Sequence, residues 1–240
     1  MIPESILQKI HNAQTSFELD RTICSLLLED FSKPGLVILP VGKTYEEGIY
    51  SLVNESLIGR DDIVHPGLHI SHLDELVLDE ATEIKSFATN LKEALPELMS
   101  KLKNNFYEID IKKPEAYQHF LNIQAGARAI YLGLGADPST AHVAFIGEEY
   151  LNREISEVFL SEATSKKLGV EKAVTVGTDI FESSSLERII LTIKGTDKVP
   201  SFLAALEDND TGLGYLLENH LAKLEIYSDH EFAQELKMKS

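Results

Sequence analysis

The sequence predicts an α/β fold in which one doubly wound, mostly parallel sheet carries helices on both faces, a Rossmann-like three-layer sandwich. Three observations support this prediction. The chain has 240 residues, of which 43% are hydrophobic and 25% charged, so it can bury a sizeable core. Short β-rich runs alternate with helical patterns, as they do where helices cover a parallel sheet. No repeat or linker divides the chain, and we expect residues 1–240 to form one domain.

Six short runs rich in Val, Ile or Leu are the strand candidates. Continuous apolar runs of this kind are typical of strands that are covered on both faces. The runs are Leu36–Leu39, Leu68–Leu73, Ala129–Leu134, Ala173–Val176, Arg188–Ile193 and Lys223–Tyr227. In an open parallel sheet the ligand binds beyond the carboxyl ends of the strands, so residues that directly follow a strand are the first candidates for function.

Helical patterns fill the intervals between these runs, with apolar residues at helical spacing. The longest is Thr82–Asn105, which Pro96 is expected to break or kink, because proline removes a backbone hydrogen bond and clashes with the preceding turn. The other expected helices are Ser16–Phe31, Thr44–Ile58, Pro114–Asn122, Val199–Leu206 and Thr211–Asn219.

The charge balance excludes several classes of partner. Lys and Arg total 22 against 39 Asp and Glu, a formal charge of -17, which would repel DNA, RNA and anionic membranes. The chain shows neither a signal peptide nor an apolar stretch of ~18 residues, so we expect a cytoplasmic protein. A single cysteine, Cys24, excludes an internal disulfide. Assembly into a homo-oligomer is left open.

The first strand candidate ends in a turn that can hold an anion. Gly42 permits a tight turn, and a following helix N-terminus offers free N–H groups. Lys43 and Thr44 add a charge and a hydroxyl. A nucleotide-binding P-loop is excluded, because Val37 stands where that motif needs glycine. Either a small phosphate site or an ordinary strand–turn–helix joint fits this segment.

The second strand candidate ends in two adjacent carboxylates, Asp74 and Glu75. Alternation places His72 and Asp74 on one face and His69 and Glu75 on the other. Asp74 at the rim of a pocket fits a general base whose pKa partial burial raises. The alternatives are a solvated pair at a helix start and a metal site. The opposed faces disfavour the metal site, and we expect no metal.

The third strand candidate carries Gly133 and Gly135, which let backbone approach a ligand closely. This pair lacks the third glycine of a dinucleotide fingerprint, so a nicotinamide cofactor is not expected. His142 lies beyond the following loop with Asp137 nearby, and a histidine there can move a proton near neutral pH. A surface or core histidine is the alternative.

Lys198 follows the fifth strand candidate, beside a glycine turn and at the start of the next helix. It is a second candidate for holding a phosphate, and the alternative is a solvated lysine.

Together these strand ends resemble the glucosamine-6-phosphate deaminase family, which shares its fold with 6-phosphogluconolactonase. Five segments match in order along nearly the whole chain. Residues 40–44 resemble the family's P-T-G-S-T-P, residues 73–76 its L-D-E-Y, residues 134–145 its G-x-G-x-D-G-H-I-A-F, residues 175–178 its T-V-G-V/T, and residues 195–198 its G-S-x-K.

The resemblance implies an aldose–ketose isomerase or deaminase that acts on glucosamine- or galactosamine-6-phosphate, or on a related sugar phosphate, without a cofactor. It implies that Asp74 is the base between C2 and C1 and that His142 opens the sugar ring, with Glu75 and Gly135 as further pocket residues. The residues implied to bind the phosphate are Gly42, Lys43, Thr44 and Lys198.

Two departures from the family pattern affect the expected site. The family has an acid and a glycine directly before the histidine, whereas here the loop from Asp137 to His142 is longer. Asp137 is one candidate to orient the imidazole, and Glu148 or Glu149 is another.

The phosphate site departs as well, because the arginine that the family uses for the phosphate has no counterpart here. Lys166 or Lys167 can replace it, with a less bidentate grip.

Two other functions compete with the isomerase or deaminase. A 6-phosphogluconolactonase carries D-E-R and G-H-T-A-S, whereas this chain has D-E-L at residues 74–76 and A-H-V-A-F at residues 141–145, which favours the isomerase or deaminase. A non-catalytic sugar-phosphate sensor is the third hypothesis.

Overall fold

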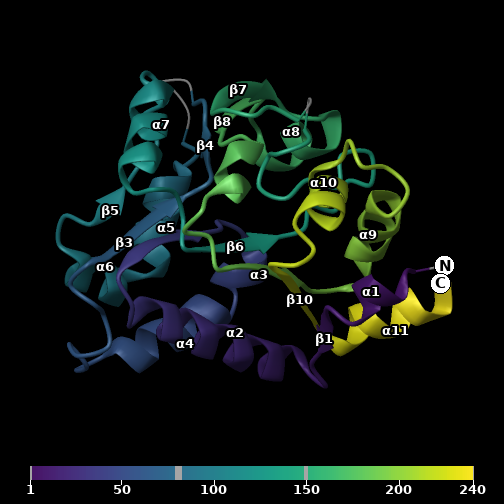
Figure 1. Ribbon diagram of the computed structural model, residues 1–240, viewed down its shortest axis with the longest axis horizontal. Coiled ribbons are helices and arrows are strands. Elements are labelled where there is room, and N and C mark those ends of the chain that lie inside the picture. The colour runs from purple at the N-terminus through teal and green to yellow at the C-terminus, as the bar shows by residue number, and fades with distance from the viewer. Residues whose placement is uncertain (1, 79–82, 149–150, 240) are drawn as a thin grey trace.

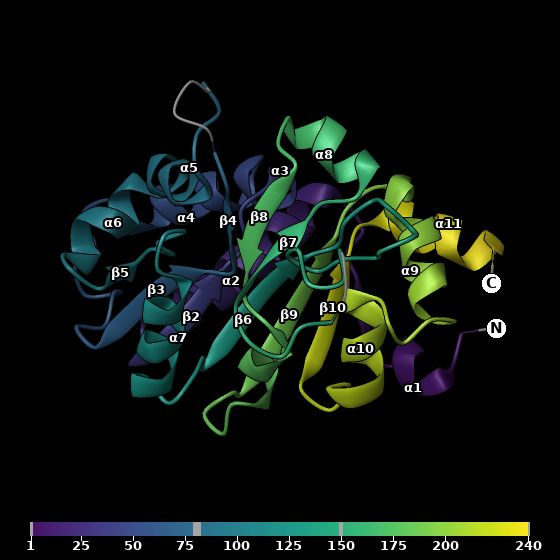
Figure 2. The same cartoon turned by 90° about the horizontal axis from the view of Figure 1, so that it is seen from above.

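The fold is built around a seven-stranded sheet in which every pair of neighbours is parallel. The computed structural model describes residues 2–78, 83–148 and 151–239. In spatial order the strands are β1 (Ile10–Asn12), β10 (Leu224–Ser228), β9 (Arg188–Ile193), β6 (Ala129–Gly133), β2 (Gly35–Leu39), β3 (Leu68–His72) and β5 (Phe106–Tyr107). Helices cover both faces, as Figures 1 and 2 show, which confirms the predicted doubly wound α/β fold.

Alternation along the central strand β2 sends its side chains into two separate cores. Leu36 and Ile38 belong to one hydrophobic cluster, and Val37 and Leu39 to the other. Because all four side chains are buried, the run reads as continuously apolar. This is the physical reason why the main strands could be recognised from composition.

One predicted strand, Ala173–Val176, does not lie in the large sheet. It corresponds to β8 (Lys172–Thr175), the middle strand of a small antiparallel sheet with β4 (Asp74–Leu76) and β7 (Ser156–Phe159). The chain leaves the large sheet at Leu73 and continues into β4, so the prediction of one sheet is wrong for this strand. A short apolar run does not specify which partner strand it pairs with.

The six predicted helices occur in the predicted order, two of them broken into two pieces. The helices are α1 (Glu4–Leu7), α2 (Ser16–Phe31), α3 (Lys43–Glu46), α4 (Ile49–Leu57), α5 (Phe87–Ala94), α6 (Pro96–Leu102), α7 (Pro114–Ile123), α8 (Glu162–Leu168), α9 (Val199–Ala205), α10 (Gly212–Asn219) and α11 (His230–Lys239), with short 3₁₀ turns η1 (Thr178–Glu182) and η2 (Thr196–Lys198). The helices α1, α8 and α11 were not predicted. Among the described residues, none of these helices is both long and apolar enough to cross a lipid bilayer.

Both breaks have a local cause. Pro96 starts α6 and ends the preceding helix, as predicted; Thr82, the expected start of that helix, lies outside the described residues. The expected helix Thr44–Ile58 is interrupted at Gly48, whose φ is 129°. A Cβ at Gly48 would lie 2.3 Å from the Asp20 carboxylate, so both the turn and the close packing require glycine.

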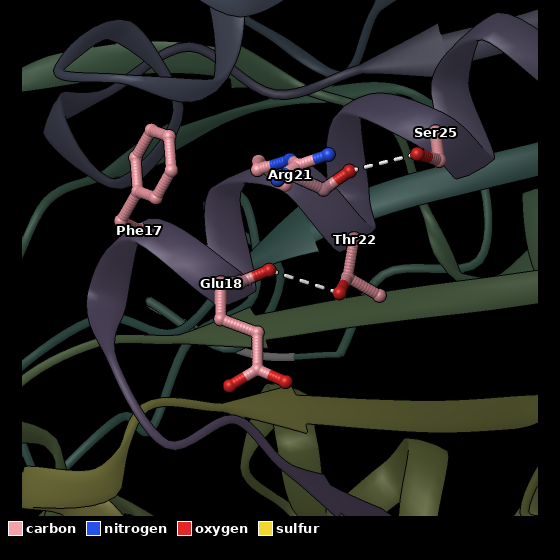
Figure 3. Close-up of a pocket in the computed structure, with 5 residues that line it drawn as sticks. All are labelled: Phe17, Glu18, Arg21, Thr22 and Ser25. Atoms are coloured by element: carbon pink, nitrogen blue, oxygen red, sulfur yellow. Dashed lines mark hydrogen bonds between the residues drawn. The ribbon is translucent and has the colours of Figure 1, made fainter.

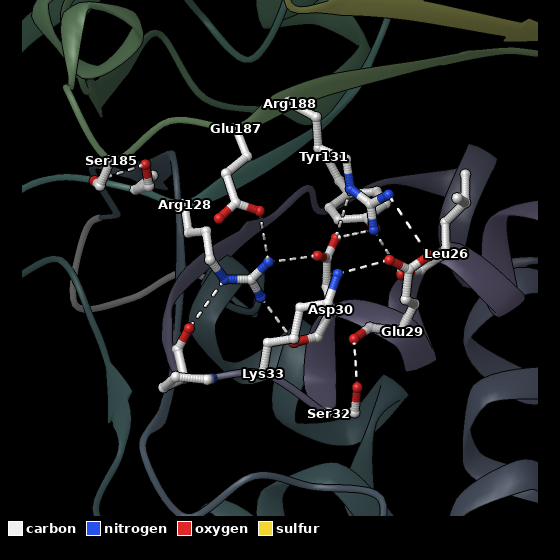
Figure 4. A network of polar contacts seen from close by, with 12 residues as sticks. Leu26, Glu29, Asp30, Ser32, Lys33, Arg128, Tyr131, Ser185, Glu187 and Arg188 are labelled. Atoms are coloured by element: carbon white, nitrogen blue, oxygen red, sulfur yellow. Dashed lines mark hydrogen bonds and ion pairs between the residues drawn. The ribbon is translucent and has the colours of Figure 1, made fainter.

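A buried ionic network ties α2 to the amino-terminal edge of the large sheet (Figure 4). Asp30 is fully buried and pairs with Arg128 and Arg188, each at 2.7 Å, and it accepts a hydrogen bond of 2.6 Å from the Tyr131 hydroxyl. Two of the five arginines are therefore used for structure, at the edge away from the strand ends where a ligand would bind.

Candidate functional site

The residues implicated by sequence gather at the carboxyl edge of the large sheet and on the small sheet beside it. Strands β2, β3, β6 and β9 all run parallel, so the segments that follow them emerge on the same side. Asp74 lies on β4, directly after β3, and His142 lies in the segment that follows β6.

Asp74 is held at one oxygen by two donors. Its Oδ1 accepts hydrogen bonds from the Thr175 hydroxyl, at 2.6 Å, and from the backbone N–H of Phe145, at 3.0 Å. Asp74 as a whole residue is half-buried. Burial raises the pKa of Asp74 to about 7; the two donors oppose this rise, and the nearby Glu75 and Glu148 charges add to it. Asp74 is therefore able to exchange a proton near neutral pH.

His142 pairs with Glu148. The distance from His142 Nδ1 to Glu148 Oε1 is 2.5 Å, and the Thr140 hydroxyl lies 3.0 Å from the same nitrogen. Glu148 has a fully buried carboxylate that accepts further hydrogen bonds from the backbone N–H of Ser161 and the hydroxyl of Thr164. The carboxylate therefore fixes the orientation of the imidazole.

The charge on Glu148 is secured by these contacts. Burial alone would raise the pKa of this carboxyl, but the hydrogen bond and charge of His142, with the Thr164 hydroxyl and the Ser161 amide, lower it below its ordinary value. Glu149, the other candidate for this role, lies outside the described residues.

Gly135 lies directly against the imidazole ring of His142. Its N–H donates to the His142 carbonyl at 2.9 Å, and a Cβ on Gly135 would lie 2.3 Å from Nε2 of the imidazole. The ring therefore packs directly against the glycine backbone. Ala141 and Ala144, on either side of the histidine, have positive φ values of 38° and 56°. Such strained backbone is unusual for alanine and is typical of functional loops.

Asp137 does not contact His142 in the structure. Its side chain accepts hydrogen bonds from the Ser139 backbone and hydroxyl and from the Ser161 hydroxyl, and its carbonyl accepts from Ala141. Asp137 thus holds the lengthened loop together through bonds within it, and it is linked to the site indirectly, through Ser161 and through Thr140, whose hydroxyl contacts His142. Orientation of the imidazole falls to Glu148, which sequence alone offered as one of several candidates.

A shallow pocket opens next to this loop. It is lined by Asp137, Ser139, Ser161, Glu162, Ala163 and Lys166. Another shallow pocket lies on α2 and contains none of the candidate site residues (Figure 3); it is lined by Phe17, Glu18, Arg21, Thr22 and Ser25.

Glu75, adjacent to Asp74, points elsewhere. It is buried, and its carboxylate accepts hydrogen bonds from the backbone N–H groups of Phe87 at 2.7 Å and Ala88 at 3.0 Å, the first residues of α5. A carboxylate there satisfies unpaired N–H groups at a helix start and complements the helix dipole. Glu75 therefore anchors α5 to β4, and its carboxylate is not a free group of the pocket.

The turn after β2 has the conformation that the sequence suggests. Gly42 has a φ of 145°, and its N–H donates to Glu46 Oε1 at 3.1 Å. Lys43 is exposed. Thr44 lies next to β6, because its hydroxyl oxygen would be 4.0 Å from a Cβ on Gly133. This contact links the turn to the strand that leads to Gly135 and His142.

Three lysines from separate elements gather near this turn, on a chain whose net charge is -17. Lys198 lies on η2, with its ammonium 3.1 Å from Asp197. Lys167 lies on α8, and its pKa is lowered first by partial burial and then by the charges of Lys198 and Lys43. Lys167 thus feels the positive charges of Lys198 and Lys43, which Asp197 partly offsets, and this local positive charge is of the kind that can attract a small anion.

The possible metal ligands of the second strand do not converge. His72 is buried; its Nδ1 donates to the Asp74 carbonyl at 2.6 Å and its Nε2 accepts from the Ile109 N–H at 3.3 Å. The His69 ring packs against Tyr107 in a tilted arrangement, with the ring centroids 5.6 Å apart. In the described part of the chain, no group of three or more His, Cys, Asp or Glu side chains is placed to hold a metal ion.

Comparison with known proteins gives matches in structure alone. The sequence matches no protein-family profile, and no curated protein is similar to it in sequence. A monomeric glucosamine-6-phosphate deaminase superposes with a TM-score of 0.78 at 19% identity, over 95% of this chain and 99% of that one. This chain has its fold. The 6-phosphogluconolactonase of Trypanosoma cruzi superposes with a TM-score of 0.74 at 18% identity, over 95% of this chain and 96% of that one.

A third neighbour is the 6-phosphogluconolactonase of Thermotoga maritima, with a TM-score of 0.70 at 16% identity, over 92% of this chain and 98% of that one. The resemblance on short motifs is thus matched by full-length similarity of fold to both kinds of enzyme. At these identities the similarity establishes the fold, and the activity has to be argued from the site.

Proposed function

We propose that this protein is a sugar-phosphate aldose–ketose isomerase or deaminase that acts on a hexosamine 6-phosphate. The observation that carries the proposal is the Asp74 carboxyl, with a pKa of about 7 and one oxygen free of the two donors. Phe145, whose N–H donates to Asp74, lies three residues after His142. The candidate base is therefore hydrogen-bonded to the chain segment that carries the candidate ring-opening residue.

Ring opening is the task we assign to His142. The imidazole delivers a proton to the ring oxygen as the C1–O5 bond breaks, and the C1 hydroxyl gives up its proton to form the aldehyde. The buried Glu148 carboxylate, 2.5 Å from Nδ1, orients the ring so that Nε2 faces the sugar. No cofactor is needed for this step.

Isomerisation is the task we assign to Asp74. The carboxylate takes the proton from C2, the electron pair of that bond forms a C1–C2 double bond, and O1 accepts a proton from water, which leaves hydroxide. The proton on Asp74 then adds to C1, while the hydroxyl or amine on C2 gives a proton to that hydroxide and becomes a carbonyl or an imine. Water hydrolyses the imine and releases ammonia.

The phosphate is assigned to the cationic site. Lys43, Lys167 and Lys198 supply the charge, and the turn at Gly42 and the Thr44 hydroxyl supply polar contacts beside β6. Charge-assisted hydrogen bonds of this kind contribute about 1.5–3 kcal/mol each, so the phosphate should dominate affinity.

A 6-phosphogluconolactonase activity is the second candidate, because six of the structural neighbours carry that name. In that case the His142–Glu148 pair would activate a water molecule for attack on the lactone carbonyl. One feature of the site disfavours it: Leu76, which stands in place of the arginine in the D-E-R motif, is buried in the hydrophobic cluster of the small sheet.

The test is a substrate panel with two readouts. Thermal unfolding is followed with hexose and hexosamine 6-phosphates and their unphosphorylated forms, and deuterium uptake at C2 is followed in D₂O. We expect stabilisation only by phosphorylated sugars, and C2 exchange that Asp74→Asn reduces by ~10²–10⁴-fold while binding persists. Hydrolysis of 6-phosphogluconolactone without C2 exchange would favour the second candidate, and tight binding without either reaction would favour a sensor.

A further inference from the structure

The two oxygens of the Asp74 carboxyl have different surroundings. Oδ1 accepts both hydrogen bonds, from the Thr175 hydroxyl and the Phe145 N–H. Within the described residues, no group donates to Oδ2. Asp74 as a whole residue is half-buried, and among the described residues its Oδ2 is not one of the buried side-chain oxygens that lack a partner, so the oxygen without donors is the one that is free to meet a substrate.

The geometry at Oδ1 is built by pairing within the small sheet. Asp74 and Thr175 are directly opposite each other in the antiparallel pair β4–β8, so their side chains project on the same face. Thr175 is 2% exposed, and its β-branched side chain has restricted χ1 freedom. The hydroxyl is thus held in place before any ligand arrives.

The second donor belongs to the His142 segment and is a backbone group. The N–H of Phe145 follows Ala144, whose φ is 56°. A backbone donor is not removed by exchanging the side chain that carries it. Thr175 is therefore the side chain through which the state of Asp74 can be altered by substitution.

We propose that Thr175 is a positioning residue for Asp74. Its hydroxyl occupies Oδ1 with a hydrogen bond, so that Oδ2 alone takes the proton from C2 of the sugar and returns it to C1. The assignment of Asp74 as the base rests on the proposed function. The O–H bond forms at Oδ2 as the C2–H bond breaks, and it breaks again as the C1–H bond forms. Because one oxygen serves both carbons, the proton stays on one face of the intermediate.

Other titratable groups around Asp74 are unchanged by a substitution at Thr175. Glu75 follows it on β4, Glu148 approaches from the segment after His142, and Tyr117 approaches from α7. His72 precedes it on β3 and holds its backbone carbonyl. A change in the titration of Asp74 on removal of the hydroxyl can thus be assigned to that hydroxyl.

The primary experiment titrates Asp74 in the unliganded protein by carbon-13 NMR of its carboxyl group, with Asp74→Asn to assign the signal. In Thr175→Val the donor is lost at constant shape, and the pKa of Asp74 should rise from about 7 to about 8 or above. Thr175→Ser restores the hydroxyl and should restore the pKa. Thr192→Val removes another buried strand hydroxyl, which contacts Tyr45, and should leave the pKa unchanged.

Measuring catalysis distinguishes a positioning role of Thr175 from a role in stabilising the fold. In Thr175→Val the acid limb of C2 exchange should move up by about one pH unit, and kcat should fall about tenfold or more with little change in KM. Thr175→Ser should recover both. The NMR titration needs no substrate, so it tests whether the Thr175 hydroxyl controls the pKa of Asp74 even if no sugar phosphate reacts. Absence of any reaction would count against the proposed function and not against this hydrogen bond. An unchanged pKa in folded Thr175→Val, or a loss that Ser does not restore, would overturn the proposal.

Discussion

Asp74→Asn should make the protein more stable, and more so at higher pH. The pKa of Asp74 rises from its ordinary 3.8 to about 7 on folding, so the folded state binds this proton more tightly than the unfolded chain. Stability is therefore lost as the pH rises between these two values, and the full cost is present above the higher one. Asparagine has no proton to lose, and its amide oxygen can still accept from Thr175 and Phe145.

The size of the gain follows from the two pKa values. One pKa unit corresponds to about 1.4 kcal/mol, so removal of the charge should stabilise the fold by at most about 2 kcal/mol at pH 5.5 and about 4 kcal/mol at pH 8. For a chain of this length each kcal/mol raises Tm by roughly 2–4 °C. The upper limit is therefore a gain of roughly 8–16 °C at pH 8.

Urea unfolding of wild type and Asp74→Asn at pH 5.5, 6.5, 7.5 and 8 measures this difference directly. Asp197→Asn is the control, because it removes an exposed carboxylate from the same edge of the sheet and should show no comparable pH-dependent gain. A stabilisation that does not grow with pH, or a less stable Asp74→Asn protein at pH 8, would refute the reasoning. The expected result would mean that burying the Asp74 carboxyl lowers the stability of the fold, a cost that is common where a residue serves function.

Three further substitutions test the rest of the site. Glu148→Gln keeps an acceptor for the neighbouring donors but removes the charge beside His142, so turnover should fall by ~10²-fold or more in a steady-state assay while the sugar phosphate still binds. Lys167→Met should weaken binding of a sugar phosphate by at least about tenfold in calorimetry, whereas Lys166→Met on the same helix should not. Gly135→Ala should displace the imidazole, because its Cβ would lie 2.3 Å from Nε2, and should lower kcat in a folded protein; full activity in that variant would contradict the packing.

The fold was predictable from sequence where the local residue pattern and the tertiary environment favour the same secondary structure. The residues of β2 are buried on both faces, so alternation is hidden and the run is apolar throughout. Pro96 begins a helix, as its missing N–H allows. By contrast α8 was not predicted, although Ser161 caps its start and Gly169 ends it with a φ of 74°. Those two signals were present in the sequence, and only the apolar periodicity was weak.

What the sequence by itself determined is the order of the main strands and of the helices between them, the doubly wound class, and the edge of the sheet at which Asp74 and His142 lie. These depend on periodicity and on chain direction, which are local properties. Only the tertiary structure decided which of two adjacent carboxylates serves the pocket and which caps a helix, since Asp74 meets β8 and Glu75 meets α5. Partners distant in sequence set those roles, and a local pattern contains no information about distant partners.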